Sequence, residues 1–165
     1  MKQVVLGLGG NIGDTKKILS QAIHLIHEEI GEVKLKSNFY QTKAWGVENQ
    51  PDFINAVIAI ETTLLPHEVL EACLLLEKKM GRNRLGKKKW RERIIDIDVL
   101  FYECEIMDTI SLKLPHSHIH ERNFVLYPLA EILPNFKHPI IGKTVLELKN
   151  QTKDRQMVTI LKNKI

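Results

Sequence analysis

The sequence predicts an α+β fold in which helices cover one face of an antiparallel sheet. Strand-like and helix-like segments follow one another in the order strand, helix, strand, strand, helix, strand. The two middle strands are separated only by a short polar loop, which favours antiparallel pairing. This order matches the ferredoxin-like split βαβ sandwich, here with a C-terminal strand and helix extension, and it leaves the second face of the sheet open for a site.

The first strand and helix account for about the first 30 residues. The stretch KQVVLGLG, residues 2–9, is an apolar run typical of a buried strand. After a Gly/Asn turn, apolar residues recur every three or four positions from about residue 14 to residue 30, which is the period of an amphipathic helix. Asp14 is a suitable cap for the start of this helix, and Gly31 is a suitable stop.

The remaining elements follow the same criteria. VKLKSNFYQTKAW (33–45) and FINAVIAIET (53–62) predict two paired strands, and residues 66–80 predict a helix that has Pro66 in its first turn and is closed by Gly81. Residues 94–102 predict a strand, and a short strand is expected around residues 110–116. ERNFVLYPLAEIL (121–133) predicts a helix with Pro128 in or beside its first turn, and QMVTIL (156–161) predicts a weak strand.

Length and composition indicate one folded domain over residues 1–165. A chain of 165 residues can bury ~70% of the surface that its unfolded form would expose. Hydrophobic residues make up 44% and charged residues 27% of the chain, which is ordinary globular composition. We expect a cytoplasmic protein, because there is no signal-peptide core, no run of ~20 apolar residues and no disulfide framework among the two cysteines.

Two aspartates interrupt the apolar strand RIIDIDVLFY. Alternate positions supply a buried face: Ile95, Ile97, Val99 and Phe101. Asp96 and Asp98 therefore share the opposite face, with Cα atoms roughly 6.6 Å apart. The segment just before them, residues 81–93, carries seven basic residues and one acid. Carboxylates that bind Mg²⁺, next to basic groups that bind phosphate, are one interpretation. Structural ion pairs between the aspartates and nearby arginines are the other.

Further residues are candidates on their chemistry. Phe53 and Asn55 share one face of their strand and could offer a ring and an amide to a flat ligand, although Phe53 could equally belong to the core. Trp90 lies within the basic segment and is a candidate for stacking. Of the three histidines in HSHIH we retain only His116. The glycines of LGLGGNIGD fit neither a GxGxxG nor a P-loop motif, and we expect a tight turn that could line a site through Asn11.

Five blocks of sequence, in order, resemble one known family. They are LGLGGNIGD, FYQT followed by NQPDFINAVIAIET, LEKKMGRNR, RIIDIDVLF and LPHSHIHERNFVLYPLAEI. This arrangement, which covers the chain up to about residue 139, is similar to that of the 6-hydroxymethyl-7,8-dihydropterin pyrophosphokinases of folate biosynthesis. The resemblance implies transfer of the β,γ-diphosphate of ATP to the pterin hydroxymethyl group, with release of AMP.

The resemblance also implies a set of site residues. Two Mg²⁺ ions would be held over the triphosphate by Asp96 and Asp98, and catalytic roles would fall to these aspartates with Arg82 and Arg93. The residues that correspond to the ATP environment are Glu77, Arg82, Arg84, Trp90, Arg93, His116 and Arg122. The residues that correspond to the pterin pocket are Thr42, Trp45, Phe53, Asn55 and Phe124. We expect a monomer.

The sequence departs from the family pattern at several positions. Lys43 replaces a common proline, and Arg91 and Glu92 stand where a small residue and a proline-like residue are usual. Leu74 and Ser117 stand where other members have polar or aromatic nucleotide contacts. The loop before the aspartate strand and the individual ATP contacts therefore match the family less closely than the aspartates do.

Two other functions remain as alternatives. A palm-like, Mg²⁺-dependent nucleotidyl transferase or cyclase also uses two carboxylates on a ferredoxin-like sheet. An RNA-binding module could share the fold and the net charge of +4. The RNA-binding module is disfavoured because the sequence has no RNP1-like strand, and we expect neither a nucleic-acid nor a membrane partner.

Overall fold

A computed structural model describes residues 1–44, 49–82 and 92–162 of the chain. Its elements, in order, are β1 (Lys2–Gly10), α1 (Thr15–Glu29), β2 (Glu32–Lys36), β3 (Phe39–Thr42), β4 (Phe53–Thr62), α2 (Pro66–Lys79), β5 (Asp96–Tyr102), β6 (Met107–Asp108), β7 (Lys113–Leu114), a 3-10 turn (Ile119–Glu121), α3 (Asn123–Ile132), α4 (Val145–Gln151) and β8 (Thr159–Leu161). In this part of the chain no helix is both long and apolar enough to cross a lipid bilayer.

The main sheet is antiparallel, as the sequence predicts. Its strand order is β5-β1-β4-β3-β8, and β2 pairs with the part of β4 that β3 leaves uncovered. The fold class is therefore confirmed. The expected continuous strand over residues 33–45 is instead two strands, β2 and β3. They are separated at Ser37, whose Oγ accepts a hydrogen bond from the Val57 amide and takes the place of a regular ladder bond.

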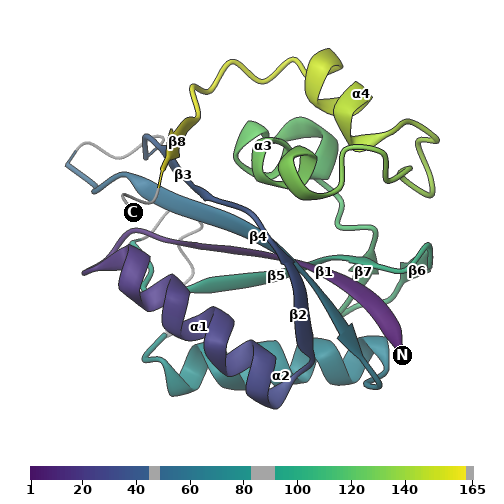
Figure 1. Cartoon of the computed structure of the whole chain (residues 1–165), viewed down its shortest axis with the longest axis horizontal. Coiled ribbons are helices and arrows are strands. Elements are labelled where there is room, and N and C mark those ends of the chain that lie inside the picture. Colours follow the sequence, from purple (N-terminus) through teal and green to yellow (C-terminus); the bar gives the residue numbers. More distant parts are fainter. Residues whose placement is uncertain (45–48, 83–91, 163–165) are drawn as a thin grey trace.

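Helices α1 and α2 cover the first face of the sheet (Figure 1). The spacing that predicts α1 buries Leu19, Ala22 and Ile26 completely against the sheet. Burial of a side chain such as Leu or Ile stabilises the fold by about 1.5–3 kcal/mol. At the start of this helix the carboxylate of Asp14 accepts a hydrogen bond from the Lys17 amide, so the predicted cap is confirmed.

Helices α3 and α4 cover part of the second face (Figure 1). A separate apolar cluster forms there between the sheet and these helices, with Val57, Leu126 and Leu129 at its centre. The expectation that the second face lies open is therefore wrong for the area under the two helices. Pro128 lies in the interior of α3 rather than in or beside its first turn, and α4 was not predicted from the sequence.

Phe101 lies on the second face, and not on the first face where simple alternation places it. In the pairing with β1, Val5 is opposite Phe101 and Leu6 is opposite Val99, which leaves Leu100 as the extra residue of a β-bulge. Leu100 and Phe101 consequently both join the second apolar cluster. The bulge follows the aspartates, so it leaves the alternation from residue 95 to residue 99 intact.

Candidate active site

Asp96 and Asp98 lie at the start of β5, on the same face of the sheet as α3. Across the sheet, Asp96 is opposite Gly9 of β1, and Gly9 is opposite Asn55 of β4. Residues directly opposite in an antiparallel pair project from the same face. We call the part of the second face that carries Asp96, Asp98, Gly9, Asn55 and Phe53 the aspartate face. The sequence correctly places the two carboxylates together.

Glycine at position 9 gives the aspartate face its shape. A Cβ atom at Gly9 would lie only 2.4 Å from Oδ1 of Asn55, so the Asn55 amide occupies the space above this glycine. A Cβ atom at Gly7, which is opposite Asp98, would have the Leu100 side chain as its nearest neighbour, at an ordinary 3.4 Å. Gly9 thus leaves room for a polar group above the sheet.

Asp96 forms ion pairs with two arginines. Its Oδ1 lies 2.5 Å from Nη1 of Arg82, and its Oδ2 lies 2.8 Å from Nη1 of Arg93. Arg82 also lies 3.0 Å from Oε1 of Glu77, a side chain that is only 1% exposed. The same Glu77 oxygen accepts a hydrogen bond of 2.7 Å from the Ile97 amide. Glu77 of α2 therefore holds both β5 and the guanidinium that faces Asp96.

Asp98 is in a different electrostatic environment from Asp96. Burial, reinforced by the negative charge of Asp96, raises the pKa of Asp98 to about 7, although Arg122 and Arg93 act in the opposite direction. A cation bound beside this carboxylate would stabilise its charged form and lower its pKa. In the described residues, no group of three or more His, Cys, Asp or Glu side chains is arranged to hold a metal ion. The two carboxylates of Asp96 and Asp98 alone suit Mg²⁺, which retains water and phosphate ligands.

The ring and amide candidates also lie on the aspartate face. Phe53 and Asn55 are two residues apart on β4, and the buried Thr42 of β3 is opposite Phe53. The guanidinium carbon of Arg93 lies 5.8 Å from the Phe53 ring centroid. Phe124, in the first turn of α3, has Arg122 over its ring at 5.7 Å. Each candidate ring is therefore adjacent to an arginine that is a candidate for phosphate binding.

His116 is held next to β5, the strand that carries the two aspartates. Its amide donates a hydrogen bond to the Leu100 carbonyl. Burial, and then the neighbouring charge of Arg122, lower the pKa of His116 to about 4. The imidazole is therefore neutral at physiological pH and offers both a donor and an acceptor. The predicted site residues Trp45, Arg84 and Trp90 lie outside the described residues, as does Arg91.

Asn11 joins three segments at the edge of the site. The side-chain Oδ1 of Asn11 accepts a hydrogen bond from the backbone amide of Arg93, and the backbone amide of Asn11 donates one to the Arg93 carbonyl, both at 2.9 Å. Its Nδ2 donates to the Pro51 carbonyl at 3.1 Å. The sequence suggests Asn11 only as a residue that could line a site. That it orients Arg93 could not be read from the sequence, because the two residues are 82 positions apart.

Comparison with known proteins identifies the family. A model of the family described as 7,8-dihydro-6-hydroxymethylpterin-pyrophosphokinase (HPPK) matches residues 5–134. The chain belongs to this family. A 2-amino-4-hydroxy-6-hydroxymethyldihydropteridine pyrophosphokinase of Aquifex aeolicus is 43% identical to it over 162 residues, which cover 98% of this chain and 99% of that protein. One from Methylorubrum extorquens is 45% identical over 148 residues, which cover 89% and 91%.

Solved structures agree on the fold. Wild-type Plasmodium falciparum HPPK-DHPS matches with a TM-score of 0.75 at 17% identity, over 91% of this chain and 44% of that longer chain. At this identity the match supports the architecture alone. Membership of the HPPK family gives the activity, which is transfer of the pyrophosphoryl group of ATP to hydroxymethyldihydropterin in folate biosynthesis. The family generally uses Mg²⁺-ATP. The nucleotidyl transferase and RNA-binding alternatives are therefore set aside.

Proposed function

We propose that pyrophosphoryl transfer takes place on the aspartate face, with Asp96 and Asp98 as ligands of two Mg²⁺ ions that also bind ATP. The observation that carries this proposal is the pair of carboxylates on one face of β5, one paired with arginines and the other half-buried with a raised pKa. When bound, the ions would neutralise the charge that develops on the transferred group and orient the triphosphate.

The arginines and Glu77 provide the phosphate environment in this proposal. Arg82 and Arg93 approach Asp96 from two different segments, and the planar guanidinium of each can bind phosphate oxygens in a bidentate manner. Glu77 is too buried to reach substrate freely, and its contacts with Arg82 and Ile97 indicate that it positions these groups. Neutral His116 is available to donate a hydrogen bond to a phosphate oxygen.

The pterin is assigned to the space between β4 and the first turn of α3. Phe53 and Phe124 would stack on its two faces, and Asn55 would bond its polar edge, with the backbone near Thr42 completing the pocket. The shared face of Phe53 and Asn55 and the nearby arginines support this assignment, because a hydroxymethyl group between the two regions would face the phosphates. Trp45, Arg84 and Trp90 are assigned to the site on the family resemblance alone.

Replacement of the aspartates tests the assignment. Asp96→Ala and Asp98→Ala should each reduce turnover at least ~100-fold, because removal of a transition-state charge contact typically costs this much. The assay follows AMP and the pterin diphosphate, and isothermal titration with Mg²⁺ and a non-hydrolysable ATP analogue counts the bound ions. Glu147→Ala, a surface carboxylate of α4, serves as a matched control. Near-normal turnover in either aspartate variant, or a single ion at saturation, would contradict the proposal.

We further propose that the chain acts as a monomeric single domain in the cytoplasm. The described segments build one six-stranded main sheet with an apolar cluster on each face, and a small β6-β7 sheet beside it, which supports a single folding unit. ATP as a substrate and the two free cysteines, Cys73 and Cys104, suit a reducing compartment. Light scattering at working concentrations should give the mass of one chain, and a mass of twice that value would contradict the monomer.

A further inference from the structure

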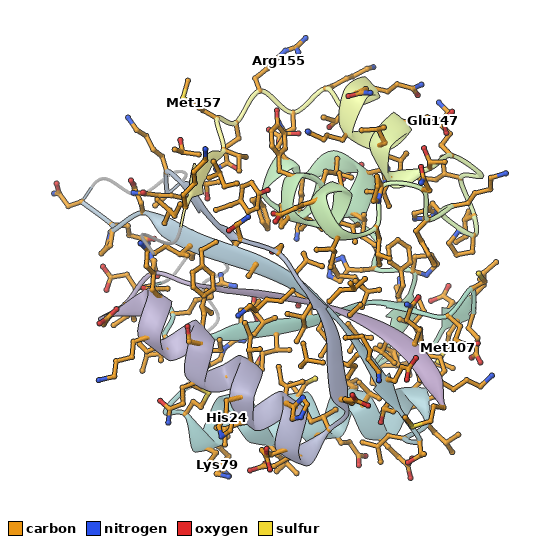
Figure 2. The ribbon with its side chains drawn as sticks, in the orientation of Figure 1. His24, Lys79, Met107, Glu147, Arg155 and Met157 are labelled. Atoms are coloured by element: carbon orange, nitrogen blue, oxygen red, sulfur yellow. The ribbon has the colours of Figure 1, made fainter. Side chains whose placement is uncertain are left out.

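The C-terminal segment, residues 152–161, returns to the site although the family match ends at residue 134. It follows α4, passes α3 and ends in β8, which pairs with β3 at the edge of the sheet (Figure 1). Side chains along it alternate in direction. Figure 2 shows Arg155 and Met157 pointing away from the molecule, whereas Asp154 and Gln156 are partly buried. The inward pair contacts both sides of the proposed pterin pocket.

Asp154 caps the first turn of α3. Its Oδ2 accepts a hydrogen bond of 2.7 Å from the Asn123 amide, and its Oδ1 accepts one of 2.9 Å from the Gln156 amide. The N-terminus of a helix carries a partial positive charge, so a carboxylate at this position is stabilising. Since both carboxylate oxygens accept from backbone amides, the segment and the helix start are held in one fixed relation.

Asn123 completes this connection from the other side. Its Nδ2 donates to the backbone carbonyls of Asp154 and Gln156, at 3.1 and 3.2 Å, and the residue is only 6% exposed. Asn123 stands between Arg122 and Phe124 in the chain. Because its backbone amide and its side chain are both held, the directions of the two neighbouring side chains are set by this contact.

Gln156 extends the connection to the opposite wall. Its Nε2 donates a hydrogen bond of 3.0 Å to the Lys43 carbonyl, immediately after Thr42 at the end of β3. The segment therefore contacts the start of α3, which carries Phe124, and the end of β3, which carries Thr42. These are two walls of the proposed pterin pocket. Three hydrogen bonds join Asn123 to residues 154–156, and a fourth, from the Gln156 amide to Asp154, lies within the segment itself.

We infer that Asp154 is a positioning residue for pterin recognition, which acts through Asn123 on Phe124 and is assisted by Gln156. This inference rests on the proposed pterin pocket. Asp154→Asn keeps the shape of the side chain but places an amide donor against one of the two backbone N–H donors. The first turn of α3 should then shift, and the Phe124 ring with it.

Titration with 6-hydroxymethylpterin, at saturating Mg²⁺ and non-hydrolysable ATP analogue, provides the test. In Asp154→Asn the dissociation constant of the pterin should rise ~10-fold, a change of about 1.4 kcal/mol. That of the ATP analogue should change less than ~2-fold, because long flexible side chains such as arginine can follow a small shift. Glu147→Gln is the matched control, since Glu147 accepts an amide hydrogen bond at the start of α4 and points to solvent in Figure 2. It should leave both affinities unchanged.

Two outcomes would overturn the inference. One is unchanged pterin affinity in Asp154→Asn. The other is an equal loss of affinity for the pterin and the ATP analogue together with a lower melting temperature, which indicates general destabilisation. Gln156→Ala, which keeps the cap and removes only the Lys43 contact, should raise the pterin dissociation constant by ~3-fold and provides an independent check. Phe124→Ala separates the inference from the pocket it rests on. If Phe124→Ala weakens the pterin and Asp154→Asn does not, only the inference fails; if Phe124→Ala has no effect, the pocket itself is wrong.

Discussion

Replacement of Gly9 by alanine should selectively impair pterin binding. The added Cβ would lie 2.4 Å from Oδ1 of Asn55, whereas an ordinary contact begins at 3.4 Å. The Asn55 amide must therefore move by roughly 1 Å, enough to break a well-formed hydrogen bond. Loss of a hydrogen bond that leaves a buried polar group unpaired costs about 2 kcal/mol, which corresponds to ~30-fold weaker pterin binding. Gly9 does not have a positive φ, so alanine adds no backbone strain.

Calorimetric titration of the pterin, in the presence of Mg²⁺ and an ATP analogue, measures this effect. Gly7→Ala is the matched control, because it adds the same methyl group to the same strand face but has its nearest neighbour, the Leu100 side chain, at 3.4 Å. Asn55→Ala should abolish the effect, so that Gly9→Ala adds little loss in that background. Full pterin affinity in Gly9→Ala, or an equal loss with and without Asn55, would refute the reasoning.

Three further predictions concern the supports of the site. Glu77→Ala should lower the free energy of unfolding, measured by urea denaturation, by about 3 kcal/mol, because the substitution leaves Arg82 and the Ile97 amide without this buried acceptor. A decrease of less than about 1 kcal/mol would contradict the role of Glu77 as a support. Arg82→Ala should slow single turnover at least ~10-fold with the ATP affinity nearly unchanged, and equal loss of both would indicate ground-state binding instead. Burial and the hydrogen bond to Glu131 raise the pKa of Tyr40. The contribution of the Tyr40 hydroxyl to stability is therefore complete below the unfolded pKa of about 10 and is lost as the pH rises above that value. Tyr40→Phe should flatten this alkaline loss in melting curves, and identical curves for the two proteins would contradict the assignment.

Local periodicity predicts most of the elements because burial on one face imposes a period of 2 or 3.6 on the sequence. The helix over residues 14–30 and the strand over residues 53–62 agree with α1 and β4 to within about two residues. The bulge at Leu100 could not be predicted in this way. An apolar residue satisfies either face of a strand that is covered on both sides, so the composition of residues 99–102 is compatible with both registers.

In the candidate site, too, local periodicity predicts some features and not others. The aspartate pair follows from strand alternation, and Phe53 and Asn55 follow from it as well. Contacts between distant segments do not: the Asn123 and Asp154 contact joins residues 31 positions apart, and each residue alone reads as an ordinary polar residue of a helix start or a loop. The spacing of the first glycines fits no nucleotide motif, but the space that Gly9 leaves for Asn55 depends on the register of β1 and β4, which the sequence does not specify.

The bulge in β5 has a mechanical consequence. It places Leu100 and Phe101 on the face that already carries Asp96 and Asp98, so one seven-residue strand carries the proposed metal ligands at its start and part of the apolar cluster beneath α3 and α4 at its end. Helix α3, which carries Phe124, packs into this same cluster together with Val57 and Ala59 of β4. A substitution in this cluster would therefore alter the distance between the proposed metal ligands and the proposed pterin ring without contacting either of them.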